Sequence, residues 1–138
     1  MLLKDKLVFV VEDNLQNRVI FQMLLIRQGA RVEFERRGRD AIYRLQTLRH
    51  VDIVIMDLAL ADGISGYDLF RQIRALEGFE QVPVVAVSAT DPAIGIPRTQ
   101  MMGFNGFIAK PLDDVQFPRQ IARVLEGHSV WETGIVLE

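Results

Sequence analysis

Apolar and polar residues are grouped along this chain in blocks whose spacing changes from one block to the next. Three short runs are apolar at every position and bounded by polar residues: Leu7 to Val11, Ile53 to Met56 and Val84 to Val87. Such runs are typical of strands that are buried on both faces of a sheet. Between them, apolar residues recur at the spacing of a helix. They form three groups: Ala41, Ile42, Leu45 and Leu48; Leu69, Phe70, Ile73 and Leu76; Phe117, Ile121, Val124 and Leu125.

Two further segments complete the first half of the pattern. Asn14 to Gln28 predicts the first helix, with Asp13 or Asn14 as its N-cap and Gly29 at its end. In Arg31 to Glu35 apolar residues alternate with charged ones, which predicts an edge strand with one wetted side.

Strand and helix alternate to the end of the chain, where Phe107 to Ala109 predicts a short fifth strand. This order implies right-handed crossovers and a parallel sheet covered by helices on both faces, a doubly wound α/β fold. One segment departs from the pattern, because Pro92, Gly95 and Pro97 interrupt the residues before Gly103. We therefore expect the fourth helix to begin late, near Pro97, and to be short.

Composition narrows the class of protein. A chain of 138 residues with 49% hydrophobic and 25% charged residues fits one globular domain. The net charge of −2 argues against a nucleic-acid backbone as ligand, and the absence of Cys excludes disulfides, thiolate catalysis and Cys-based zinc sites. No apolar run reaches the roughly 20 residues that cross a bilayer, and Met1 to Lys6 does not resemble a signal peptide. We expect a cytoplasmic protein.

The candidate chemistry lies where the predicted strands end. Glu12 and Asp13 follow the first strand, Asp57 the third, Ser88 the fourth and Lys110 the fifth. Taken singly, each has an ordinary explanation as a cap, a turn residue or a surface charge. In an open parallel sheet, however, the carboxyl ends of the strands meet at one edge, where ligands bind.

Three carboxylates beside one ammonium group carry excess negative charge, which calls for a counter-ion. Oxygen ligands favour Mg²⁺ over zinc. Carboxylates, Mg²⁺, a hydroxyl and an ammonium group together suit phosphoryl transfer. In this interpretation Asp57 is the nucleophile, Glu12 and Asp13 hold the metal, and Lys110 and Ser88 contact phosphoryl oxygens. His50 and His128 fall at predicted helix ends and are interpreted as surface residues.

From about Lys6 to Gly127, the chain resembles the receiver domains of bacterial two-component response regulators. The resemblance rests on four motifs in order: Val10-Val11-Glu12-Asp13-Asn14, Val54-Ile55-Met56-Asp57, Val87-Ser88-Ala89 and Phe107-Ile108-Ala109-Lys110-Pro111. It implies a flavodoxin-like sheet of five strands in the order 2-1-3-4-5. It also implies a receiver over residues 1–127, followed by a tail or the start of a linker over 128–138.

The resemblance implies a mechanism as well. Asp57 would receive phosphate from a phosphohistidine of a histidine kinase or phosphotransfer protein, with Mg²⁺ held by Glu12, Asp13, Asp57 and the carbonyl of Ala59. It implies a cis peptide between Lys110 and Pro111. Phosphorylation would draw Ser88 towards the phosphoryl group and move Phe107 inward; alternatively, Phe107 is a permanently buried core residue.

The sequence departs from the receiver pattern in the loop after Asp57. Ala61 stands where receivers usually have Pro, and the loop is one residue longer than is usual in receivers, which predicts a looser loop. Ala59 and Thr90 occupy positions that tune hydrolysis of the phosphoryl group in receivers. Because Ala59 offers no polar atom to orient a water molecule, we expect slow self-dephosphorylation.

The output and the length of the natural chain stay open. The usual output surface of receivers is the face of the fourth helix, fifth strand and fifth helix, and an unknown protein or a second copy is the expected partner there. The broken stretch before Gly103 means that partner choice does not transfer from the family. The chain is either a stand-alone receiver or a receiver cut from a longer kinase or regulator. The apolar tail around Trp131 either packs back on the domain or meets a partner.

Three rival functions have weaker support in the sequence. A phosphatase of the haloacid dehalogenase type expects a second Asp two residues after the nucleophile, where this chain has Ala59. A nucleotide-binding protein expects a Gly-rich phosphate loop after the first strand, and none is present. A receiver-like interaction module that works without phosphate has no need for the complete set of polar residues at the strand ends.

Overall fold

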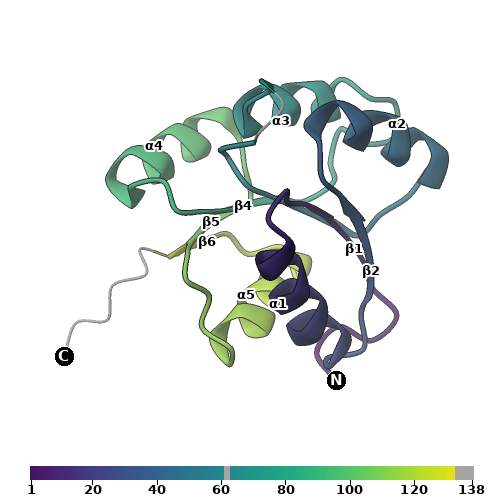
Figure 1. Ribbon diagram of the computed structural model, residues 1–138, viewed down its shortest axis with the longest axis vertical. Coiled ribbons are helices and arrows are strands. Elements are labelled where there is room, and N and C mark those ends of the chain that lie inside the picture. Colours follow the sequence, from purple (N-terminus) through teal and green to yellow (C-terminus); the bar gives the residue numbers. More distant parts are fainter. Residues whose placement is uncertain (61–62, 133–138) are drawn as a thin grey trace.

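The protein folds into a single parallel sheet with helices on both faces (Figure 1). The structure is a computed structural model that describes residues 1–60 and 63–132. The strands are β1 (Leu7–Val11), β2 (Arg31–Glu35), β3 (Ile53–Met56), β4 (Val84–Ser88), β5 (Gly106–Ala109) and β6 (Val130–Glu132). The helices are α1 (Leu15–Ile26), α2 (Gly38–Leu48), α3 (Gly66–Arg74), α4 (Pro92–Met102) and α5 (Gln116–Leu125). All strand pairs are parallel, in the order β2-β1-β3-β4-β5-β6. The predicted doubly wound fold and the order 2-1-3-4-5 are confirmed, with one strand added.

The core has two layers because the sheet is buried on both faces. Helices α2, α3 and α4 cover one face, and α1 and α5 cover the other (Figure 1). Strands β1, β3 and β4 are buried at every position, as their unbroken apolar runs predict, whereas β2 at the edge is only partly buried. None of the helices in the described part of the chain has the length and apolarity needed to span a membrane.

The first helix begins where the sequence predicts. Asn14 is its N-cap, and the side chain of Asn14 accepts a hydrogen bond from the amide of Asn17 at 3.0 Å. After the helix, Gly29 adopts a φ of 92°, a left-handed conformation that favours glycine.

The prediction for α4 is wrong: the helix begins at Pro92, and it has 11 residues. Pro92 lies in the first turn, where no amide donor is needed, and the Asp91 side chain accepts from the Ala93 amide at 3.0 Å. Pro97 lies inside the helix without ending it. The hydroxyl of Thr99 donates to the carbonyl of Gly95 at 2.7 Å, an additional bond across the turn that contains Pro97.

The C-terminal segment was expected as a tail, but residues 130–132 form the sixth strand of the sheet. The alternative in which the segment packs back on the domain therefore holds for these residues. Residues 133–138 lie outside the described residues, as does the predicted looseness at Ala61.

Candidate functional site

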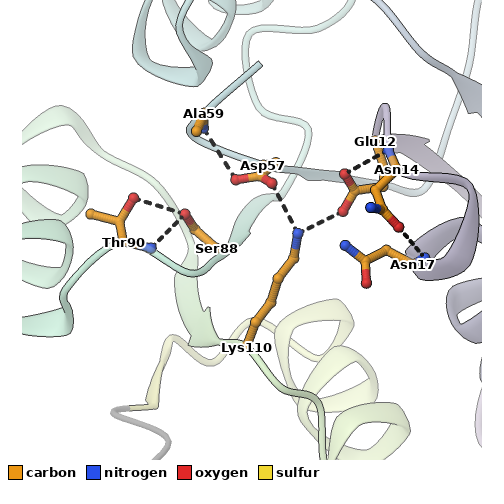
Figure 2. A network of polar contacts seen from close by, with 8 residues as sticks. All are labelled: Glu12, Asn14, Asn17, Asp57, Ala59, Ser88, Thr90 and Lys110. Carbon is orange, nitrogen blue, oxygen red and sulfur yellow. Dashed lines mark hydrogen bonds and ion pairs between the residues drawn. The ribbon is translucent and has the colours of Figure 1, made fainter. Parts of the chain in front are cut away.

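Two carboxylates and one ammonium group meet at the carboxyl edge of the sheet. Glu12 follows β1, Asp57 follows β3 and Lys110 follows β5. The Lys110 Nζ lies 2.7 Å from the Glu12 Oε1 and 2.9 Å from the Asp57 Oδ2 (Figure 2). Residues separated by 98 and 53 positions in sequence are thus brought into one ion-pair network. Below, we call Glu12, Asp57 and Lys110 the ion-pair triad.

The backbone around the ion-pair triad fixes its free oxygens. The amide of Ala59 donates to the Asp57 Oδ1 at 3.1 Å, and the amide of Asn14 donates to the Glu12 Oε2 at 3.3 Å (Figure 2). Each carboxylate therefore holds Lys110 with one oxygen and a backbone amide with the other. These bonds fix the orientation of both carboxylates.

Burial distinguishes the two carboxylates. The side chain of Glu12 is 2% exposed, whereas that of Asp57 is 11% exposed and that of Lys110 is 16% exposed. Asp57 is thus the carboxylate that an incoming group can reach more easily. Glu12 is a buried charge that depends on its partner.

The ammonium group of Lys110 is stabilised in its charged form. Desolvation by burial alone lowers its pKa, but the hydrogen bonds that it donates to Glu12 and Asp57 and the negative charges of these groups outweigh burial, so the pKa of Lys110 is raised. Lys110 therefore stays a cation throughout the neutral range. It supplies the only positive charge in the ion-pair triad, which keeps a net charge of about −1 by simple counting of its three ionised groups.

Ser88 lies at the end of β4, where its carbonyl accepts from the Lys110 amide at 2.9 Å, but its hydroxyl is bonded to Thr90 and not to a side chain of the ion-pair triad. It is fully buried, its hydroxyl donates to the Thr90 Oγ1 at 2.9 Å, and its oxygen accepts from the Thr90 amide at 3.1 Å (Figure 2). From the sequence, Thr90 is expected only to tune hydrolysis of the phosphoryl group, and its hydrogen bonds to Ser88 are not predicted. An Ser-x-Thr spacing after a buried strand is the local signal for such a turn.

Phe107 of β5 is completely buried and lies against α4. A Cβ placed on Gly95 would lie 2.5 Å from the Cε2 of Phe107, so the aromatic ring fits only because residue 95 is a glycine. The structure thus places Phe107 in the core. Whether it moves on phosphorylation stays a prediction.

Asp13 does not join the ion-pair triad. It follows Glu12 and is only partly buried. Within residues 1–60 and 63–132, no three acidic or histidine side chains lie close enough together to hold a metal ion. The oxygen atoms of Glu12 and Asp57 are nevertheless the ligand type that a hard divalent cation prefers. The set of Glu12, Asp13, Asp57 and the Ala59 carbonyl therefore stays a prediction, and its chemistry fits Mg²⁺.

The peptide bond between Lys110 and Pro111 is cis, the geometry that the resemblance implies. Next to it, a cavity of about 580 Å³ opens between the start of the β5–α5 loop and α1. Lys110, Pro111, Ile20 and Met23 are among its lining residues. Sequence reasoning did not identify this cavity, because its walls come from segments about 90 residues apart.

Comparisons with known proteins agree with this geometry. The family model of the response regulator receiver domain matches residues 8–122. Among solved structures, the receiver domain of the sensor histidine kinase PA1611 from Pseudomonas aeruginosa is 29% identical, with a TM-score of 0.77. The match covers 88% of this chain and 98% of that one, and the structure has a magnesium ion coordinated in the active site cleft. The chemotaxis response regulator CheY4 of Vibrio cholerae, 22% identical with a TM-score of 0.79, shares the fold; that match covers 88% of this chain and 99% of that one.

Curated relatives differ in how much of their length the chain covers. The probable histidine kinase 4 of Oryza sativa is 28% identical over 90% of this chain, but the match covers 14% of the kinase. The hybrid signal transduction histidine kinase M of Dictyostelium discoideum is 33% identical over 77% of this chain, which is 5% of that protein. The polar-differentiation response regulator DivK of Brucella ovis is 29% identical over 87% of this chain and 96% of its own length. The chain thus resembles both a part of large kinases and an entire small regulator.

Proposed function

Since the chain belongs to the family of response regulator receiver domains, the phosphate-accepting domains of two-component signalling, we propose that Asp57 is its phosphate acceptor. The donor is a phosphohistidine on a histidine kinase or a phosphotransfer protein. A carboxylate oxygen of Asp57 attacks the phosphorus, the bond between phosphorus and the imidazole nitrogen breaks, and that nitrogen keeps the electron pair. The product is an acyl phosphate on Asp57. The domain carries out this transfer on itself and is not proposed to be a turnover enzyme.

The observation that carries this proposal is the bonding of Asp57. Its Oδ2 lies 2.9 Å from Lys110 and its Oδ1 accepts from the Ala59 amide, so the orientation of the carboxylate is fixed. Glu12, which shares Lys110, is too deeply buried for that role. Among the residues at the strand ends, Asp57 combines a fixed carboxylate with access to solvent.

Lys110 has two roles in this proposal. Before transfer it holds the two carboxylates together, and after transfer its ammonium group is placed to contact a phosphoryl oxygen on Asp57. A fixed cation that needs no reorganisation is an efficient way to stabilise charge on the transferring group. The raised pKa of Lys110 ensures that this charge is present at neutral pH.

Mg²⁺ is the proposed cofactor, held by Glu12, Asp13, Asp57 and the carbonyl of Ala59. When bound, it would neutralise the negative charge that a phosphoryl group brings to the two carboxylates of the ion-pair triad. The magnesium ion in the receiver of PA1611 supports this assignment.

The Ser88 hydroxyl is the proposed sensor of the phosphoryl group. To donate to a phosphoryl oxygen, it must leave the Oγ1 of Thr90, to which it now donates. Phosphorylation would thus exchange one hydrogen bond for a charge-assisted one, which is roughly twice as strong. The slow loss of phosphate expected from Ala59 stays part of the proposal.

The proposed docking surface for the phosphohistidine protein is the outer side of α1 together with the cavity beside Lys110. That side of α1 exposes Leu15, Val19, Ile20, Met23 and Ile26. Contiguous apolar surface of this kind marks an interaction site more often than chance exposure. Because the apolar surface adjoins the cavity that Lys110 lines, a partner seated there places its phosphohistidine near Asp57.

The rival functions keep less support. A phosphatase of the haloacid dehalogenase type needs a carboxylic acid at residue 59, where this chain has the methyl group of Ala59. A module that works without phosphate would not require a lysine held between a buried and a partly exposed carboxylate. The cytoplasmic location and the face used for output stay predictions.

The test is intact-protein mass after incubation with Mg²⁺ and acetyl phosphate. We expect the mass of one phosphoryl group to be added to the wild type and not to Asp57→Asn, and EDTA to prevent the addition. Asp13→Asn tests the metal set and should raise the Mg²⁺ concentration required. Steady release of phosphate from many esters would favour the phosphatase, and no adduct would favour the module that works without phosphate.

A further inference from the structure

The short strand β6 is closely fitted to the edge of β5. Val130 pairs with Gly106, Trp131 with Phe107, and Glu132 with Ile108. A Cβ on Gly106 would lie 2.8 Å from the carbonyl oxygen of Val130, so the close approach of the two backbones requires glycine at residue 106. The fit shows that β6 is part of the sheet.

The side chains of β6 contact both layers of the domain. Trp131 packs against the core on the side of α2, α3 and α4, and Val130 packs against the core on the side of α1 and α5. The Gln120 Nε2 of α5 donates to the Glu132 Oε2 at 3.3 Å. The strand therefore closes the space between α4 and α5 at the edge of the sheet.

Neighbouring strands and core residues connect β6 to the end of β4, where Ser88 lies. Ser88 and Phe107 lie on neighbouring strands, where β4 and β5 pair. Phe107 is wedged against Gly95 of α4, and it pairs with Trp131 of β6 within the same core cluster. Because the ring of Phe107 has no spare room beside Gly95, movement of α4 towards β5 would displace Phe107.

From this path we propose that β6 is a regulatory strand: it covers the edge of β5 between α4 and α5, and phosphorylation of Asp57 loosens it. The dependence on phosphorylation rests on the function proposed above. Release would leave the amide and carbonyl groups on this edge of β5 without a strand partner.

The low stability expected of β6 indicates that phosphorylation loosens this strand first. When Ser88 leaves Thr90, the connection from Thr90 into α4 changes, and closely packed side chains transmit this change because they cannot deform freely. A strand of three partly buried residues at the end of the sheet is the least stable element on the path. Rearrangement at Ser88 therefore releases β6 before it disturbs the inner strands.

Trp131 allows a direct test, since it is the only tryptophan of the protein. With Mg²⁺ and beryllofluoride, which imitates the phosphoryl group, we expect its emission to shift to longer wavelength and its quenching by acrylamide to increase. Fluorine NMR reports independently whether the adduct has formed. An adduct without a change at Trp131 overturns this inference and leaves the proposed function standing, whereas no adduct overturns both.

Gly106→Ala tests the coupling from the other side, because its Cβ meets the carbonyl of Val130. In this variant we expect Trp131 to be exposed before any adduct forms. Linkage requires the loosened chain to bind beryllofluoride more tightly, by about 5-fold or more for a typical coupling. Equal affinity in the variant and the wild type, with Trp131 exposed in the variant, would overturn the coupling.

Two controls guard against a fold that is simply damaged. Gly38→Ala makes the same chemical change at the start of α2, where the nearest atoms would be 3.4 Å away or more, and it should behave as the wild type in both measurements. Gln120→Ala removes the bond to Glu132 without adding bulk and should shift both measurements in the same direction as Gly106→Ala, by less. Opposite shifts in Gln120→Ala would contradict the proposal.

Discussion

The two halves of the candidate site differ in how their polar groups are bonded. After β1 and β3, Glu12 and Asp57 are each bonded directly to Lys110, which follows β5, at 2.7 and 2.9 Å. On β4, the hydroxyl of Ser88 is bonded to Thr90 and not to any member of the ion-pair triad. One half is therefore assembled around the reactive carboxylate, and the other is held apart from it (Figure 2).

This difference separates chemistry from signalling. A preorganised set of charges lowers the barrier to transfer because it needs no rearrangement at the moment of reaction. A hydroxyl that must break an existing bond to reach the phosphoryl group reports that the reaction has occurred. Changes to the ion-pair triad should therefore affect phosphorylation and stability, whereas changes on β4 should affect the response.

The largest effect is expected from Lys110→Met. It leaves the buried carboxylate of Glu12 next to Asp57 without a counter-ion, and removal of one partner of a buried pair costs about 3–5 kcal/mol. We expect this loss in the free energy of unfolding, measured with urea, together with loss of phosphorylation by acetyl phosphate. Lys4→Met at an exposed lysine is the control and should change neither. A Lys110→Met protein as stable as the wild type would show that Lys110 does not stabilise the buried carboxylate of Glu12.

Ala59→Asn adds a polar side chain beside Asp57 without touching Lys110. An amide at this position can orient an attacking water molecule, so we expect phosphate to be lost from Asp57 several-fold faster than in the wild type. The measurement is the decay of the phosphorylated mass after the phosphodonor is removed. Ala59→Val, which is larger but apolar, is the matched control. An unchanged decay in Ala59→Asn would refute slow hydrolysis through the missing polar atom.

Ser88→Ala removes the hydroxyl on β4 and leaves the ion-pair triad intact. Loss of its two bonds to Thr90 should lower the free energy of unfolding by about 1 kcal/mol. We expect Asp57 to be phosphorylated at nearly the rate of the wild type, while the change in Trp131 fluorescence is lost. If phosphorylation fails in Ser88→Ala while the fold is retained, the two halves are not separate.

The smallest effect is expected from a carboxylate at the amino ends of the strands, where Asp52 directly precedes β3. The Asp52 Oδ2 accepts from the Leu7 amide at 2.7 Å. Desolvation raises the pKa of Asp52, but that amide and the adjacent His50 outweigh it, so the pKa is lowered. A lowered pKa in the folded state stabilises the fold above the ordinary value of 3.8, and this stability is lost as the pH falls through the folded value.

Asp52→Asn should therefore be less stable than the wild type at neutral pH by about 1 kcal/mol or less. The gap in the free energy of unfolding should close below pH 3.8, and phosphorylation should be unchanged. If the difference in free energy of unfolding widens in acid, the pKa of Asp52 is raised by folding and not lowered.

Much of the fold was predictable because the strands that carry the site have unbroken apolar runs. The bounds of β1, β2 and β3 agree with the sequence pattern. The error in α4 arose because Pro97 and Gly95 are helix breakers in isolation, whereas here Asp91 and Thr99 supply bonds and Gly95 makes room for Phe107. Tertiary contacts of this kind leave no mark in local sequence.

The candidate site was predictable to a similar extent. That Glu12, Asp57 and Lys110 converge follows from the topology of a parallel sheet, which collects the strand ends. The orientation of Ser88 towards Thr90 depends on a side-chain rotamer, and the position of Asp13 outside the ion-pair triad depends on the turn into α1. Strand β6 was missed because a three-residue strand is too short for a periodicity signal.

The most direct test of the central claim is to locate the phosphoryl group by peptide mapping after incubation with Mg²⁺ and acetyl phosphate. We predict that the label lies on Asp57 in both the wild type and Ser88→Ala, and that Lys110→Met carries none. A label on any other residue, or a chain that takes up no phosphate at all, would contradict the claim.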